Sequence, residues 1–142
     1  MQHPFHLAFP VDDLEKAVQF YHHLLGCPMG RTASAWADFD FFGNQITAHL
    51  KPEACNGTKE NKVDGDDVPV RHFGAILGWA EWQALEEKLR SSGQEFIIGP
   101  KIRFQGKPGE QGTFFIRDPA GNALEFKTFK TPGKVFETEN TN

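Results

Sequence analysis

The stretch FHLAFPVDDLEKAVQFYHHLLG, residues 5–26, changes from the pattern of a strand to that of a helix. A run of mainly apolar residues stops near Pro10, where a strand is expected to end. Asp12 and Glu15 have the spacing of a capping box, and apolar residues then recur every three or four positions. Gly26 suits the position after the last helical turn. The stretch therefore predicts one strand followed by one helix.

The second half of the chain repeats this order. The run from Val70 to Leu77 predicts a strand, and an apolar stripe through Trp82 and Leu89 predicts a helix that ends near Gly93. Further strands are predicted after each helix: 35–42 and 45–50 in the first half, and 95–98, 113–117 and 123–129 in the second. We interpret each half as a strand, a helix and then a meander of strands, βαβββ, an order that an internal duplication would produce.

This repeat divides the 142 residues into two modules of one domain. The predicted bounds are about 3–52 for the first module, 53–68 for a polar linker, 69–130 for the second module and 131–142 for a tail. Helices grouped beside mostly antiparallel strands predict an α+β fold.

Composition limits the kinds of partner. Hydrophobic residues make up 39% of the chain and charged residues 24%, as in a globular protein. A net charge of −4 gives no support for binding nucleic acid or an anionic membrane, and no apolar run reaches the roughly 20 residues of a membrane helix. Two cysteines form no disulfide framework, so we expect a cytoplasmic protein. The expected partner is a small-molecule substrate.

Four residues in predicted strands have the chemistry of metal ligands. His6 and His72 open their modules and lie 66 positions apart, while His49 and Glu125 lie in the closing strands, 43 and 53 positions later. Imidazoles and a carboxylate bind divalent metals. Because side chains alternate along a strand, each of these residues shares its face mainly with small or polar neighbours, which leaves room for a metal and a substrate.

The sequence resembles the vicinal oxygen chelate superfamily, which includes glyoxalase I, extradiol dioxygenases, methylmalonyl-CoA epimerase and the bleomycin- and fosfomycin-resistance proteins. The resemblance covers roughly residues 3–130 and is carried by HLAFPVDDLEKAVQFYHHLLG, HFGAIL and DPAGNALEF. Two further stretches, VDGDDVPVRHFG and PGEQGTFFIRDPAGNALEFK, are most similar to small proteins described as predicted extradiol-type dioxygenases.

The resemblance implies two βαβββ modules whose eight strands form a partly open, curved, mostly antiparallel sheet around a metal-binding cavity. It also implies that His6, His72 and Glu125 bind one divalent ion per chain. Where glyoxalase-like members carry a further carboxylate ligand, this sequence has His49. Three roles stay open for His49: an acid/base beside the metal, a fourth ligand, or neither.

Other polar residues are candidates for binding substrate. They are Gln105, Lys107, Glu110 and Gln111 in a loop after the short strand, and Lys127 beside Glu125. A loop of this kind can cover a cavity, although a solvated loop and a surface lysine are the alternative interpretations.

Two histidines and a carboxylate are typical of nonheme Fe(II) oxygenases. We therefore predict an extradiol-type dioxygenase that acts on a small substrate with two adjacent oxygens, with His49 as the catalytic acid/base. Extradiol enzymes usually carry a Tyr in the strand that precedes the ligand Glu. In this sequence that strand is predicted at 113–117, and it contains no Tyr. The alternatives are a glyoxalase- or epimerase-like lyase or isomerase using Ni, Co, Mn or Zn, and a ligand-sequestering protein without catalysis. The family resemblance also suggests a homodimer.

Overall fold

The computed structural model describes residues 3–57, 59–63 and 65–138, which form two compact units. The first unit holds residues 1–58 together with the turn 118–122, and the second holds the remainder. Elements of the first unit are β1 (His6–Val11), α1 (Leu14–Val18), the π-helical η1 (Gln19–Leu24), β2 (Met29–Ala33), β3 (Trp36–Phe41), β4 (Asn44–Leu50) and the short turn η2 (Pro52–Ala54).

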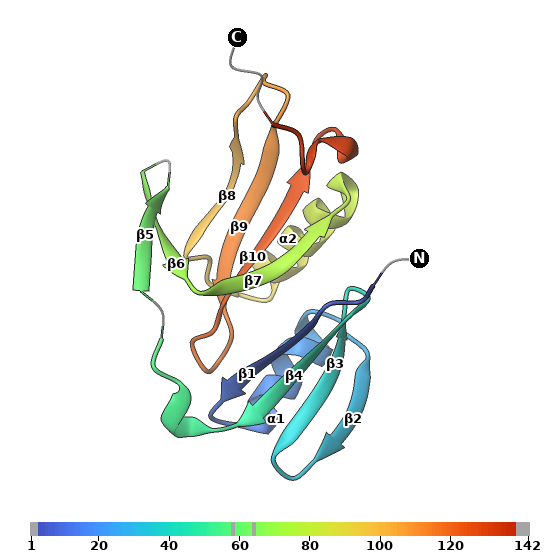
Figure 1. Ribbon diagram of the computed structural model, residues 1–142, viewed down its shortest axis with the longest axis vertical. Coiled ribbons are helices and arrows are strands. Elements are labelled where there is room, and N and C mark those ends of the chain that lie inside the picture. Colours follow the sequence, from blue (N-terminus) through green and yellow to red (C-terminus); the bar gives the residue numbers. More distant parts are fainter. Residues whose placement is uncertain (1–2, 58, 64, 139–142) are drawn as a thin grey trace. The chain divides into compact units, whose positions relative to one another are not determined.

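The second unit begins with a hairpin and then repeats the order of the first. Its elements are β5 (Lys59–Val63), β6 (Asp66–Val70), β7 (His72–Leu77), α2 (Trp79–Ser91), β8 (Ile98–Arg103), β9 (Gln111–Arg117), β10 (Ala123–Phe129) and the short turn η3 (Pro132–Lys134). Each unit contains one four-stranded sheet (Figure 1). Within the described residues, no helix is long and apolar enough to cross a membrane.

The two sheets have the same topology. Their strand orders are β1-β4-β3-β2 and β7-β10-β9-β8. The pairs β1–β4 and β7–β10 are parallel, and the other neighbours are antiparallel. The predicted α+β class and the predicted repeat of strand, helix and meander are therefore confirmed.

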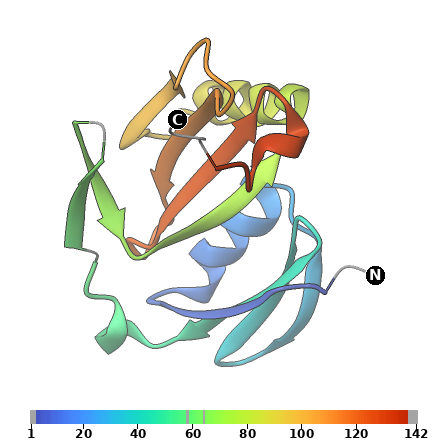
Figure 2. The ribbon, with the colours of Figure 1, turned by 45° about the horizontal axis from the view of Figure 1, so that its top comes forward.

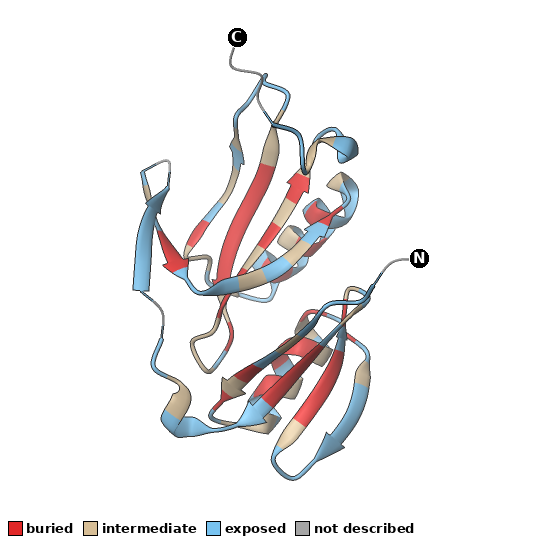
Figure 3. Ribbon diagram, viewed as in Figure 1, coloured by how far each residue is buried: buried red, intermediate tan, exposed pale blue. Residues whose placement is uncertain are grey.

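A helix packs on one face of each sheet, and Figure 2 shows α2 along the second sheet. The indole Nε1 of Trp82 on α2 donates to the carbonyl oxygen of Phe126 on β10 at 2.9 Å. Buried residues concentrate in the central strands and the inner faces of the helices (Figure 3). Most strand phenylalanines lie in these cores, among them Phe39, Phe41, Phe114 and Phe115.

The core of the first unit is built around Tyr21, the only tyrosine of the chain. Its ring is fully buried and lies 5.3 Å from the ring centres of both Phe9 and Phe39. Its hydroxyl donates to Oδ2 of Asp118 at 2.7 Å. Asp118 also accepts from Asn122, whose amide donates to the carbonyl oxygen of Pro10. Burial, aided by the neighbouring Asp118 charge, raises the pKa of Tyr21 well above its ordinary value.

Several predicted boundaries are wrong in detail. The strand expected at 95–98 is found at Ile98–Arg103, because the register shift between Ile98 and Lys101 carries the strand through Gly99-Pro100. A Gly-Pro pair normally reads as a stop, but here it marks a bulge. The N-cap of α1 is Asp13, which accepts from the Lys16 backbone N–H, rather than Asp12.

Three strands were absent from the sequence-based prediction. Strand β2 is exposed at four of its five residues, so it lacks the apolar alternation that marks a half-buried strand. Strands β5 and β6 form a hairpin within the segment predicted as a linker. β5 is exposed along its whole length, which explains why its composition resembles that of a loop.

Candidate metal centre

The second unit brings two of the predicted ligands together. His72 opens β7, and Glu125 lies on its parallel neighbour β10, two positions beyond the residue paired with His72. The two side chains share one face of the sheet, and His72 Nε2 lies 3.2 Å from Glu125 Oε1. Gly74 is the register partner of Glu125, and a methyl group there would overlap the Glu125 carbonyl oxygen. A glycine is therefore required where these strands meet.

Neighbouring groups fix the orientation of both side chains. His72 Nδ1 lies 2.7 Å from the Pro69 carbonyl oxygen, which can only accept, so Nδ1 carries a proton. When the ring is neutral, its lone pair is on Nε2 and faces Glu125; when the ring is protonated, Nε2–H donates to Glu125 Oε1. The ring also meets the edge of Phe115, with centres 5.0 Å apart. Glu125 Oε2 accepts the Thr113 hydroxyl at 2.5 Å, which leaves Oε1 for His72.

The pairing shifts the pKa values of both His72 and Glu125. The hydrogen bond to Glu125 raises the pKa of His72 above 6.5, although burial opposes the change. For Glu125, burial is the largest influence and raises the pKa, but the hydrogen bonds from His72 and Thr113 and the charge of Lys127 outweigh it. The pKa of Glu125 therefore lies below its ordinary 4.5.

His72 and Glu125 lie in a pocket of about 280 Å³ within the second unit. Two predicted substrate-binding residues, Gln111 and Lys127, also line it. The remaining lining residues were not predicted from the sequence: Val63, Val68, Arg103, Phe104 and Phe115. Arg103 and the two valines were not predicted because the short strand was expected at 95–98 and the hairpin segment was interpreted as a linker.

The other loop candidates lie elsewhere. Gln105 and Lys107 are exposed in the turn after β8 and do not line this pocket. Glu110 accepts from the Gly106 backbone N–H at 2.7 Å and lies 3.4 Å from Lys130 Nζ, so its carboxylate helps hold the loop itself.

The first unit carries the other two predicted residues, His6 and His49, and both are exposed. His6 pairs in register with Gln45, whereas His49 pairs with Pro10. The two histidines are therefore four positions apart along neighbouring strands, or about 13 Å at the usual strand rise. Since a metal–imidazole bond is about 2 Å long, one ion in this unit does not suit both.

Matching registers identify the counterpart of Glu125 in the first unit. Glu125 lies two positions beyond the partner of His72, and Thr47 lies two positions beyond the partner of His6. His49 therefore corresponds to Lys127 rather than to Glu125. The similar chain intervals to His49 and Glu125 concealed this difference, because the connections in the two units differ in length.

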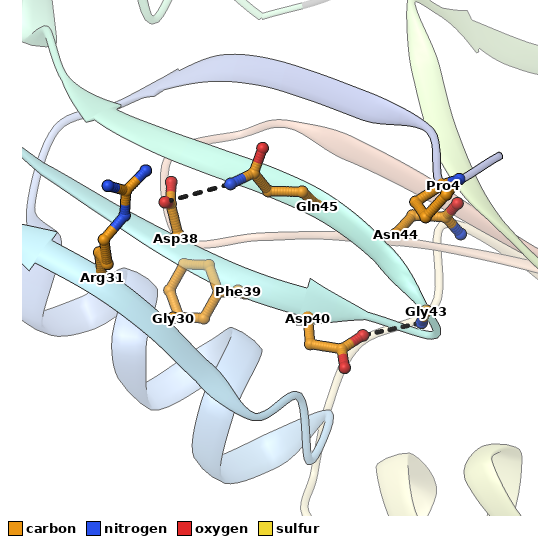
Figure 4. A pocket seen from close by; sticks show the side chains of 9 residues that line it. All are labelled: Pro4, Gly30, Arg31, Asp38, Phe39, Asp40, Gly43, Asn44 and Gln45. Atoms are coloured by element: carbon orange, nitrogen blue, oxygen red, sulfur yellow. Dashed lines mark hydrogen bonds between the residues drawn. The ribbon is translucent and has the colours of Figure 1, made fainter.

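A second pocket, of about 370 Å³, lies over this part of the first unit (Figure 4). Asp38 on β3 is buried there and accepts the Thr47 hydroxyl at 2.6 Å and the Gln45 amide at 3.3 Å. Arg31 on β2 lies beside Asp38 in the same pocket. Across residues 3–57, 59–63 and 65–138, no group of three or more His, Cys, Asp or Glu side chains converges in a metal-binding arrangement.

Comparison with known proteins identifies the family. Residues 3–126 match the family model described as Glyoxalase/Bleomycin resistance protein/Dioxygenase superfamily. The chain belongs to this superfamily. The fold agrees with that of a solved glyoxalase/bleomycin resistance protein/dioxygenase from Alicyclobacillus acidocaldarius, at 31% identity and a TM-score of 0.76. That match covers 95% of this chain and 97% of the other.

Two further relatives have more specific names. A curated relative, the metallothiol transferase FosB of Shouchella clausii, is 23% identical over 140 residues, covering 96% of this chain and 86% of FosB. The fosfomycin resistance protein FosX of Listeria monocytogenes shares the fold, with a TM-score of 0.69 at 16% identity, covering 95% and 99% of the two chains. The superfamily thus includes proteins whose names indicate quite different activities.

The His72–Glu125 pair predicts that the free energy of unfolding depends on pH when a chelator keeps the protein free of metal. His72 has a raised pKa, so its contribution is fully present below pH 6.5 and is lost as the pH rises through the raised value. Glu125 has a lowered pKa, so its contribution is present above pH 4.5 and is lost as the pH falls through the lowered value. The pair should therefore stabilise most between about pH 4.5 and 6.5.

Urea unfolding at pH 5.5 and pH 8.5 would measure this effect. We expect His72→Gln and Glu125→Gln each to reduce the difference in unfolding midpoint between the two pH values. His49→Gln removes an exposed histidine of the first unit, leaves the pair intact and serves as the control. An unchanged pH dependence in both Gln variants would show that the pair does not control it.

Proposed function

We propose that this protein is a metal-dependent enzyme in which His72, Glu125 and His6 hold one divalent ion. The observation that carries the proposal is the orientation of His72. Its Nδ1–H donates to the Pro69 carbonyl, as metal-binding histidines usually donate their second ring nitrogen to a carbonyl or carboxylate. This leaves the Nε2 lone pair beside Glu125 Oε1, in a pocket that also contains polar side chains.

The spacing of the two donor atoms also suits a common ion. Neighbouring ligands at bond lengths of about 2.0–2.2 Å lie about 3.0–3.4 Å apart in octahedral or tetrahedral geometry. The Nε2–Oε1 separation is 3.2 Å. Thr113 holds the other carboxylate oxygen, which is the kind of outer contact that orients a ligand. The third ligand, His6, belongs to the first unit and comes from the family resemblance.

The first unit supports a three-ligand site rather than a four-ligand site. Thr47 stands at the position that corresponds to Glu125, and its hydroxyl is bound to Asp38. His49 lies two positions beyond Thr47 and pairs with Pro10. We therefore propose His49 as an acid/base that moves a substrate proton, since imidazole titrates near neutral pH.

Two histidines and one carboxylate leave coordination positions open, and with Fe(II) such a site binds both a chelating substrate and O₂. We therefore propose extradiol-type oxygenation of a small substrate with two adjacent oxygens. Gln111 and Lys127 line the pocket and would donate hydrogen bonds to the substrate, while Phe115 forms an apolar wall. Buried Tyr21, bound to Asp118, is not available as a catalytic phenol, which argues for a substrate other than a simple catechol.

The match to FosB supports a second candidate, in which a thiol is transferred to a chelating substrate. A dependence of turnover on added thiol rather than on O₂ would identify that reaction. Dependence on neither, with turnover of 2-oxo compounds, would favour the lyase or isomerase alternative with Ni, Co, Mn or Zn. Tight substrate binding without any turnover would identify a sequestering protein.

The metal proposal predicts that His72→Ala loses most of its bound metal, because one of three protein ligands is removed. The protein should be prepared anaerobically, and its metal content should be measured by elemental analysis and calorimetric titration with Fe(II) or Mn(II). Lys127→Met is the matched control, since it changes the same pocket without removing a proposed ligand. Parent-like affinity in His72→Ala would refute this ligand set.

The proposed role of His49 predicts that His49→Ala keeps its metal but loses turnover. A general acid/base typically contributes about 10²- to 10⁴-fold to the rate, and we expect the upper part of this range because no phenol shares the task. Metal content and O₂ uptake with a panel of catechols and 2-oxo acids would measure both properties. Metal loss as large as that in His72→Ala would instead make His49 a ligand.

We also propose that the chain forms a homodimer. Most strand phenylalanines are buried, so the apolar contact surface must come from other side chains, such as exposed Ile76 on β7 and Phe5 before β1. Light scattering should give twice the 16.0 kDa of one chain at micromolar concentration. A mass of one chain over this range would contradict the proposal.

A further inference from the structure

Phe104, the first residue after β8, lines the pocket that contains His72 and Glu125. It is a large apolar residue, yet 42% of its surface is exposed. Its backbone φ is +55°, in the left-handed region that bulky residues rarely adopt. Neither burial in a core nor backbone preference accounts for a phenylalanine at this position.

Phe42 is the other described residue, glycines aside, with a positive φ, and its conformation has a structural reason. Phe42 and Gly43 form the two-residue connection between β3 and β4, with φ values of +52° and +87°. Tight hairpin turns of this kind require a positive φ at both positions. Phe104 is instead the first residue of its turn, because its carbonyl accepts from the Lys107 backbone N–H at 3.0 Å. That position carries no such requirement.

Hydrogen bonds of the loop hold Phe104 in its costly conformation. Besides the bond from Lys107, the Glu110 carboxylate accepts from the Gly106 backbone N–H at 2.7 Å and lies 3.4 Å from Lys130 Nζ, just after β10. A strained residue persists only where its surroundings fix the backbone, and such residues gather at binding sites. The loop therefore keeps the Phe104 ring at the pocket before any ligand arrives.

The pocket has an apolar part as well as the polar groups beside His72. Phe115 meets the His72 ring edge-on, with centres 5.0 Å apart, and Val68 packs with Phe115 and Ile98 in a buried cluster. Among the described residues, this cluster does not include Phe104. The exposed part of the Phe104 ring is thus an apolar surface of the pocket that a ligand can cover.

We propose that Phe104 determines substrate specificity, because its ring packs against a flat apolar group of the substrate. This inference rests on the proposed function and names the substrate class. The substrate is a small molecule that has an aromatic or other unsaturated group next to its two adjacent oxygens, with the oxygens toward His72 and Glu125. Aromatic rings favour edge-on or offset contacts with one another, and such a contact contributes about threefold to tenfold in affinity.

Replacement of Phe104 by asparagine separates a binding role from a packing role. Asparagine tolerates the left-handed region, so Phe104→Asn relieves backbone strain while it removes the ring. We expect its midpoint of urea unfolding to equal or exceed that of the parent, together with weaker binding of an aromatic ligand. A phenylalanine that served only for packing would lower the midpoint and leave ligand preference unchanged.

The test uses the full chain after removal of metal by a chelator, with phenylpyruvate and pyruvate as probes. The two probes share their adjacent oxygens and differ by a phenyl group. NMR titration should show that the parent prefers phenylpyruvate, and that Phe104→Asn loses about threefold to tenfold of this affinity while it keeps that for pyruvate. Phe104→Tyr retains the ring and should bind both probes like the parent.

Phe42→Asn is the matched control, because it makes the same exchange at a positive φ in the first unit. Its affinities for both probes should equal those of the parent.

Three results would overturn the proposal. A parent without preference for phenylpyruvate would show that the pocket does not bind an apolar group. Parent-like preference in Phe104→Asn would assign that group to another side chain, and a lowered unfolding midpoint in this variant would make the ring a packing residue. Since no metal is present, failure here is distinct from failure of the metal proposal, which the His72→Ala titration detects.

Discussion

The close parallel pairing of β7 and β10 is the constraint on which the site in the second unit depends. Gly74 lets the two backbones meet at Glu125, where any side chain would overlap the opposite carbonyl. This contact sets the offset between His72 and Glu125, and the Pro69 carbonyl then sets which ring nitrogen faces the carboxylate. A neutral imidazole and an ionised carboxylate are suited to bind a cation when each is oriented by a hydrogen bond to a neighbouring group.

The two units use the same topology for different chemistry. Each has a threonine hydroxyl bound to a carboxylate between the two central strands of its sheet: Thr47 with Asp38, and Thr113 with Glu125. In the first unit the carboxylate is buried on β3, and in the second it lies on β10 beside His72. The duplication thus preserved a backbone while the polar groups moved to different strands.

The hairpin of β5 and β6 forms one wall of the pocket in the second unit, and the first unit has no counterpart of this hairpin among its described residues. Val63 and Val68 line this pocket, and Asp66 binds Lys101 and Arg103 of β8.

The sequence by itself determined the class of fold, the repeat of strand, helix and meander, and the strand positions of His6, His72 and Glu125, because hydrophobic periodicity and glycine positions are local signals. It did not determine which polar groups meet. The relation of His49 to Lys127, the carbonyl behind His72 and the burial of Arg103 depend on strand register, on the bulge at Gly99-Pro100 and on the hairpin. These features arise from contacts between residues far apart in the chain, which no local pattern records.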